Sequence, residues 1–187
     1  MATAVTAPLL ALTLLGGCVP PLAVTPPRSD GALAPRPSLF DFPWVWTDER
    51  GERVAFSRWR GEPLVVAGIY SQCRVTCPRT ISKLRDAYVE LRRRGLAAQF
   101  LLVTINPTVD TPERLRRFKQ SEGFPEEWRL LSGSVAQTRE LADYLDIHVM
   151  DGGEHLVHDA RIVVFDSRGA PARSIDGSIF DDGANVL

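Results

Sequence analysis

The sequence predicts an α/β domain in which a β-hairpin leads into a central mixed sheet flanked by helices. Two apolar runs without polar alternation, residues 64–70 and 98–106, are typical of strands that are covered on both faces. Each run is followed by a helix-type pattern, and a turn signal at residues 166–169 indicates a late antiparallel hairpin. A chain of 187 residues with 44% hydrophobic content is long enough for one domain with a substantial core.

The first elements are short strands. Residues 44–47 and 52–56 are expected to form two strands joined by a turn at 48–51, so a hairpin opens the domain. The buried strand at 64–70 follows, directly after Pro63. We expect it to be a central strand.

A helix is expected directly after this central strand. Pro78 suits the first helical position, because its missing N–H has no partner there in any case. The helix is expected to stop at Gly95. Its apolar stripe, at spacings of four, three, four and three, consists of Cys77, Ile81, Leu84, Tyr88 and Leu91.

Two more helices and a strand complete the prediction. Residues 110–113 combine a capping residue, a proline and early negative charge at a helix start. Ser134 is expected to start another helix, with an apolar side made by Val135, Leu141 and Leu145. A strand over 162–165 ends at the turn 166–169. This order, with two cysteines at the start of the first helix, is the thioredoxin-like arrangement.

The amino-terminal part differs in composition from the rest. Residues 1–17 carry no charge and contain an apolar run of signal-peptide length, and the sequence ending at Cys18 resembles a bacterial lipobox. Residues 18–38 are proline-rich and predict a tether, which leaves 39–187 for the domain. We therefore expect a lipid on Cys18 that anchors the protein to the membrane in the bacterial cell envelope, on the extracytoplasmic side. An uncleaved hydrophobic anchor is the alternative.

Composition argues against two classes of protein. A formal net charge of −1 argues against an electrostatic binder of nucleic acid or of anionic membranes. Three cysteines are too few for a small disulfide scaffold.

Cys73 and Cys77 lie between the central strand and the first helix. A disulfide that closes so short a loop stabilises a fold little, so a purely structural bridge is the weaker interpretation. At a helix amino terminus, unpaired N–H groups and the positive end of the dipole favour a thiolate. A thiolate serves either a redox pair that attacks disulfides or a site for a soft metal such as Cu(I). The pair alone does not decide between these functions.

A histidine can decide between them. His158 belongs to a glycine-led segment that feeds the strand at 162–165, and this strand neighbours the first helix in a thioredoxin-like sheet. His158 can therefore complete a site of two sulfurs and one nitrogen, whereas His148 and His155 are expected to be solvated. A structural zinc finger does not fit, because His155 lies 155 − 77 = 78 residues after Cys77.

Three motifs in this order resemble the SCO/SenC family of copper-binding, thioredoxin-like proteins, and the resemblance covers about residues 40–177. They are a C-x-x-x-C-P motif, an Asp-Thr-Pro helix start, and a histidine eight residues before an aspartate that opens a turn. In this chain they fall on Cys73, Cys77 and Pro78, on Asp110, Thr111 and Pro112, and on His158 and Asp166.

The resemblance implies an exported, membrane-tethered domain that binds one copper ion through Cys73, Cys77 and His158. The family is associated with delivering copper to, or reducing the cysteines of, the binuclear copper site of cytochrome c oxidase. The partner implied is a copper-accepting or thiol-bearing protein such as an oxidase subunit. Arg74 and Val75 stand where the family commonly has Pro and Asp.

The leading prediction is thus a copper metallochaperone with a redox-active cysteine pair. The alternative is an enzyme, a thiol-disulfide oxidoreductase that keeps the cysteines of a partner reduced, so whether the protein is an enzyme stays open. A peroxiredoxin-like protein is a third alternative, but the chain lacks the Pro-x-x-x-Thr-x-x-Cys pattern before Cys73.

Overall fold

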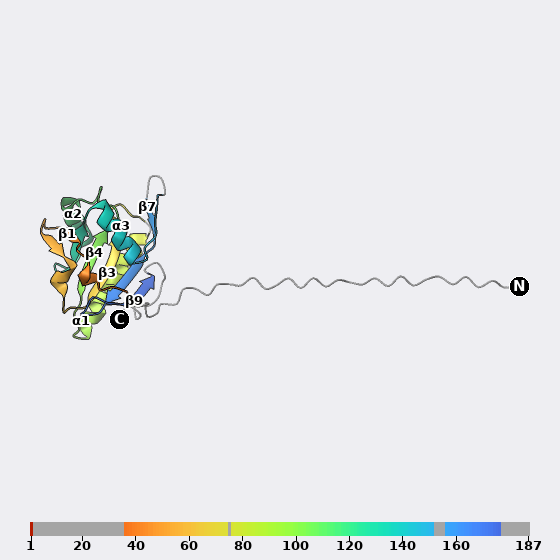
Figure 1. Ribbon diagram of the computed structural model, residues 1–187, viewed down its shortest axis with the longest axis horizontal. Coiled ribbons are helices and arrows are strands. Elements are labelled where there is room, and N and C mark those ends of the chain that lie inside the picture. The colour runs from red at the N-terminus through yellow and green to blue at the C-terminus, as the bar shows by residue number, and fades with distance from the viewer. Residues whose placement is uncertain (2–35, 75, 152–155, 177–187) are drawn as a thin grey trace.

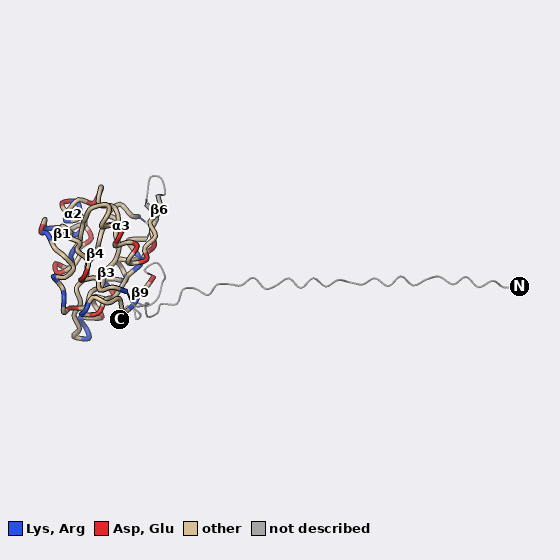
Figure 2. Tube along the Cα trace, viewed as in Figure 1, with Lys and Arg blue, Asp and Glu red and all other residues tan. Residues whose placement is uncertain are grey.

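The computed structural model describes residues 36–74, 76–151 and 156–176 together with Met1 (Figure 1). The expected signal peptide, Cys18 and His155 lie outside the described residues, and so does nearly all of the expected tether. Among the residues that are described, no helix is both long enough and apolar enough to cross a membrane. Basic and acidic segments are interspersed over the domain in Figure 2, in line with its nearly balanced charge.

A mixed sheet forms the centre of the described domain, with the strand order β2-β1-β5-β4-β3-β8-β9. Strands β3, β4 and β5 are parallel, and the other neighbours in this sheet are antiparallel. The strands are β1 Val45–Asp48, β2 Arg53–Ala55, β3 Leu64–Ile69, β4 Gln99–Thr104, β5 Arg129–Ser132, β8 Arg161–Phe165 and β9 Pro171–Asp176. The predicted α/β fold with a leading hairpin and a central mixed sheet is confirmed.

Helices pack on both faces of this sheet. They are α1 Thr76–Arg93, α2 Pro112–Glu122 and α3 Val135–Tyr144. The apolar residues of α1 and α2 share one buried cluster with Val65, Ala67 and Ile69 of β3. Those of α3 share the other cluster with the alternate residues of β3, Leu64 and Val66, and with the aromatic side chains of the hairpin. Because β3 is buried on both faces, all six of its residues are apolar or glycine.

Helix α1 begins at Thr76, two residues before the predicted start at Pro78. The proline is tolerated at the third helical position, because the first four N–H groups of a helix have no intrahelical partner. The predicted apolar stripe is confirmed, since Cys77, Ile81, Leu84 and Leu91 are buried and Tyr88 is half-buried. The predicted end of the helix at Gly95 is also confirmed, because this glycine adopts φ 68° and its N–H bonds to the Arg92 carbonyl.

Helix α3 begins with a complete capping box. The Ser134 hydroxyl accepts from the Gln137 N–H, and the Gln137 side chain accepts from the Ser134 N–H. Leu141 and Leu145 are buried as predicted, but the prediction for Val135 is wrong, because its side chain is 48% exposed. Six positions separate Val135 from Leu141, which places the two side chains about 120° apart around the helix.

Two segments were not predicted as strands. Strand β5 is only four residues long and has no alternating pattern of its own. The second is a separate two-stranded ribbon, made by β6 Val149–Asp151 and β7 Leu156–His158. This ribbon matters for function because His158 is its last residue, in register with Val149.

Candidate metal centre

The two cysteines lie where β3 passes into α1. The Cys73 N–H donates to the Tyr70 carbonyl at 2.9 Å, which closes a tight turn just after the strand. Cys77 lies in the first turn of α1 and is 1% exposed, whereas Cys73 is half-buried. The backbone N–H of Cys77 points at the Cys73 sulfur across 3.4 Å. The free N–H groups at the start of α1 thus stabilise negative charge on Cys73, as the sequence predicted.

A buried carboxylate holds the turn that carries Cys73. Asp110 is fully buried and accepts hydrogen bonds from the Ser71 N–H at 3.0 Å and from the Thr104 hydroxyl at 2.7 Å. The Ser71 hydroxyl also donates to Asp110, and Arg114 donates to the Ser71 hydroxyl at 3.0 Å. The cysteine turn is therefore tied to the end of β4 and the start of α2. The sequence predicted Asp110 at a helix start but not its contact with the cysteine turn. The signal for that contact was its position just after the carboxyl end of a buried strand, the edge at which the cysteines were also expected.

The ribbon β6–β7 brings His158 to the cysteines. The imidazole is 4% exposed, and its Nδ1 lies 2.9 Å from the Asp159 carbonyl. A carbonyl only accepts, so Nδ1 carries the proton of the neutral ring and Nε2 keeps its lone pair. Nε2 lies 3.7 Å from the Cys77 sulfur and 3.3 Å from the Thr76 hydroxyl. The ring therefore presents an unprotonated nitrogen to the cysteine pair.

The three candidate donor atoms form one compact group. The sulfurs of Cys73 and Cys77 and one nitrogen of His158 lie within 4.8 Å of one another. Ligands about 2.0–2.3 Å from a metal ion lie up to ~4.6 Å apart, so small side-chain movements suffice to close the group around one ion. Two thiolates and an imidazole are a soft donor set, which suits Cu(I) or Zn²⁺ better than Mg²⁺ or Ca²⁺.

The two thiols differ in ionisation. The pKa of Cys73 lies well below its ordinary value, first because the Cys77 side chain hydrogen-bonds to its sulfur, with Thr76 adding to the effect against burial. The pKa of Cys77 is raised, first by its hydrogen bond to Cys73 and then by burial. At neutral pH the pair therefore holds one thiolate, on Cys73, and one thiol, on Cys77.

His148 lies apart from this group. His148 has a side chain that is 62% exposed, with its Nδ1 2.7 Å from a carboxylate oxygen of Asp159. It is exposed, as predicted, but paired with a carboxylate. Cys18 and His155 lie outside the described residues.

The fold and the site together define a class: a thioredoxin-like domain in which a cysteine pair at a helix start faces a buried histidine. Within that class, the chain belongs to the SCO1/SenC family, whose sequence model matches residues 34–183. A curated relative, the SCO1 protein homolog of Bacillus subtilis (strain 168), is 22% identical over 104 residues. That match covers 54% of this chain and 53% of the relative, so the chain spans about half the length of the relative.

Solved structures share the fold. A SCO1/SenC family lipoprotein from Bacillus anthracis str. Ames has a TM-score of 0.69 at 19% identity, covering 80% of this chain and 93% of that one. Yeast Sco1 with copper bound has a TM-score of 0.64 at 20% identity, covering 75% of this chain and 83% of that one. BsSco, a member of the Sco family of cytochrome c oxidase assembly proteins with an identified disulfide switch, has a TM-score of 0.65 at 17% identity, covering 82% and 88%. The predicted thioredoxin-like fold and family are confirmed.

Proposed function

We propose that the protein is a membrane-tethered copper metallochaperone that acts in the assembly of the copper site of cytochrome c oxidase. Its copper ligands are the sulfurs of Cys73 and Cys77 and Nε2 of His158. One observation carries the proposal: the buried His158 ring turns its unprotonated nitrogen toward the cysteine pair, 3.7 Å from the Cys77 sulfur. Membership of the SCO1/SenC family supports it, and so does the copper bound to yeast Sco1.

Copper is the cargo in this proposal, and the site suits both uptake and release. Cys77 must lose its proton when it binds the ion, so loading at neutral pH releases a proton. Cys77 and His158 are buried, while Cys73 is half-buried. Cys73 is therefore the ligand that a partner can reach first, and exchange of its thiolate for a partner's donor begins the transfer.

The second candidate function is thiol-disulfide exchange, favoured by the unequal ionisation of the pair. The Cys73 thiolate attacks a partner disulfide and forms a mixed disulfide, and the leaving sulfur takes up a proton. Cys77, once deprotonated, then attacks Cys73 and releases the second partner thiol. The partner gains two electrons and two protons, one proton from Cys77 and one from solvent. This protein is oxidised to the Cys73–Cys77 disulfide.

Anaerobic titration of Cu(I) against a competing chelator tests the first proposal. His158→Ala removes one of three donors, so we expect the affinity for Cu(I) to fall by at least about tenfold, with altered thiolate-to-copper absorption. His148→Ala is the matched control, because this exposed histidine lies outside the donor group. We expect it to bind copper as the unchanged protein does.

The same variants separate the two functions. An oxidoreductase needs only the cysteines, so His158→Ala would reduce a test disulfide at an unchanged rate, and copper binding would be weak from the start. Equal copper affinity in the unchanged protein and in His158→Ala contradicts the ligand assignment.

A further inference from the structure

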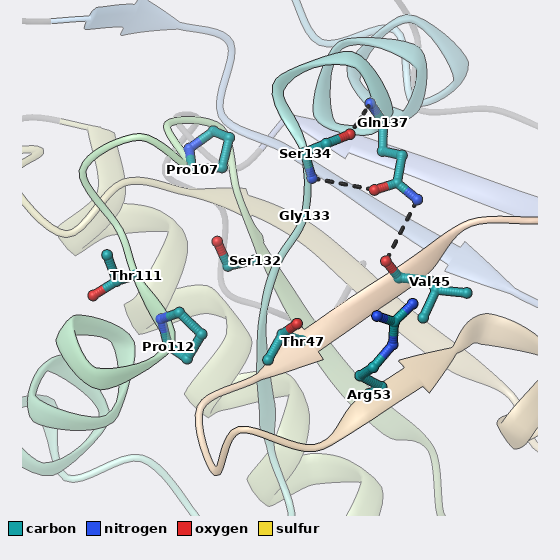
Figure 3. Close-up of a pocket in the computed structure, with 10 residues that line it drawn as sticks. All are labelled: Val45, Thr47, Arg53, Pro107, Thr111, Pro112, Ser132, Gly133, Ser134 and Gln137. Carbon is teal, nitrogen blue, oxygen red and sulfur yellow. Dashed lines mark hydrogen bonds between the residues drawn. The ribbon is translucent and has the colours of Figure 1, made fainter.

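A polar pocket with a volume of about 580 Å³ lies at the carboxyl edge of the parallel strands, apart from the metal centre (Figure 3). Ser132, the last residue of β5, is in its wall, whereas Cys73 follows the carboxyl end of β3, and β4 lies between these two strands. None of Cys73, Cys77 and His158 lines this pocket. Ligands of open α/β sheets commonly bind outside the carboxyl ends of the strands.

One wall of the pocket is a row of three donor side chains on neighbouring strands. Thr47 of β1 is directly opposite Arg53 of β2 on one side and Ser132 of β5 on the other. Residues directly opposite each other in antiparallel pairs project from the same face of a sheet. A guanidinium and two hydroxyls therefore line the same side of the pocket.

Ser132 is the one buried polar residue of the described lining. It is 7% exposed, and its hydroxyl has no hydrogen-bond partner among the residues that the structure describes. In Figure 3 this hydroxyl points away from β5 into the space bounded by Pro107 and Thr111. The oxygen still contacts solvent, so water satisfies it in the free protein, and an oxygen of a ligand can replace that water.

Two helix amino termini also border the pocket. Thr111 caps α2 and Ser134 caps α3, and both residues line the pocket. Each cap satisfies one N–H, of Arg114 and of Gln137 respectively, and the other N–H groups of the first turn have no intrahelical partner. The positive ends of both helix dipoles therefore favour an anion here.

The charge of the lining also favours an anion. Arg53 is the one ionised side chain in the described lining, which contains no carboxylate. No ion pair joins Arg53 to another described residue, so its guanidinium is available to a ligand. A guanidinium is planar and presents several N–H donors, which match the oxygens of a phosphate.

We propose that this pocket binds the phosphate group of a small molecule. Donors come from the strand row and from two helix starts, which suits a tetrahedral anion with several oxygens. The volume leaves room for more than a free phosphate ion, so a small phosphate ester fits the site. The proposal goes beyond copper handling and does not depend on it.

The test is a titration of the ¹⁵N-labelled full chain in detergent with inorganic phosphate, at constant ionic strength maintained with chloride. We expect saturable shifts of the backbone amides of Glu113, Val135 and Ala136 in the first turns of α2 and α3. Ser132→Ala and Arg53→Gln should each weaken binding by about tenfold. Arg58→Gln, which removes an exposed arginine outside the lining, should leave it unchanged.

Glycerol 3-phosphate forms the second arm. Tighter binding than that of inorganic phosphate assigns the site to a phosphate ester, and equal binding assigns it to the phosphate group alone. Absence of saturable shifts at these amides overturns the proposal, and so does equal weakening by Arg58→Gln, which indicates unspecific attraction to positive charge. Copper binding by Cys73, Cys77 and His158 is measured separately, so failure of one proposal leaves the other standing.

Discussion

Cys73 and Cys77 are the same residue type four positions apart, and their surroundings make them chemically different. The Cys73 sulfur receives the N–H of Cys77 at the helix start and is half-buried. The Cys77 sulfur faces His158 in the core and is buried. Cys73, just before α1, is thus an accessible thiolate, whereas Cys77, in the first turn of α1, is an inaccessible thiol.

Alkylation by iodoacetamide tests this difference. Because the pKa of Cys73 is lowered, its thiolate persists as the pH falls, so its alkylation rate should be nearly constant between about pH 5 and pH 8. An ordinary thiol would react roughly tenfold faster for each pH unit in that range. Peptide mass mapping identifies which cysteine carries the label.

Cys73→Ser provides the control. Cys77, the other cysteine of the pair, is buried, so we expect it to be labelled slowly and at a rate that rises with pH. A Cys73 rate that increases with pH as that of a free cysteine does would show that the first turn of α1 does not hold a thiolate.

At the scale of elements, a buried ion pair joins α2 to the hairpin turn and to β5. Lys119 donates to Glu49 at 2.8 Å and to the Trp128 carbonyl at 2.7 Å. Glu49 in turn accepts from the Leu130 N–H at 2.9 Å, and the two side chains are 7% and 2% exposed. Three separate elements therefore depend on one pair of charges.

We expect Lys119→Ala to lower the free energy of unfolding by about 3 kcal/mol, because it removes the nearest cation of the buried Glu49 carboxylate and leaves only Arg129 and Arg50, at 3.8 and 3.9 Å. Arg117→Ala is the matched control on the same helix. Its ion pair with Glu113 has side chains that are 63% and 64% exposed, so the loss should be below about 1 kcal/mol. Urea unfolding followed by circular dichroism measures both, and equal losses would contradict a structural role for the buried pair.

Elements differed in how well local sequence predicted them. The central strands and the capped helices have signals within a few residues: apolar runs in β3 and β4, Thr111 before α2, and the capping box before α3. Strand β5 has no such signal, because its four residues become a strand by pairing with β4 and β1. The ribbon that carries His158 likewise depends on pairing between β6 and β7.

At the scale of the whole molecule, the start of the described domain and the candidate metal centre are at opposite ends of the sheet. The Leu39 N–H donates to the Gly169 carbonyl at 2.8 Å, which fixes the start of the domain at the turn after β8. Because β8 is antiparallel to β3, with Phe165 opposite Leu64, this turn lies at the amino end of β3. Cys73 follows the carboxyl end of β3, so the cysteine pair lies at the end of the sheet away from Leu39.

This arrangement suits a domain anchored through Cys18, which stays a prediction from sequence. We expect the mature chain to begin at Cys18 and to carry lipid there. Intact mass of the protein extracted in detergent checks this, since cleavage and lipidation change the mass in a defined way. A mass equal to that of an unmodified chain from Met1 would favour the uncleaved anchor instead.

The sequence by itself determined the fold class, the family, the cysteine pair at a helix start and the capped starts of α2 and α3. Those features depend on residues close together along the chain, where hydrophobic periodicity, capping and motif spacing act. Only the tertiary structure brought Nε2 of His158 to the Cys77 sulfur and left His148 exposed on Asp159. It alone also buried Asp110 behind the cysteine turn and aligned Thr47 with Ser132. These contacts join residues far apart in sequence, and strand order and register, which no local signal specifies, decide them.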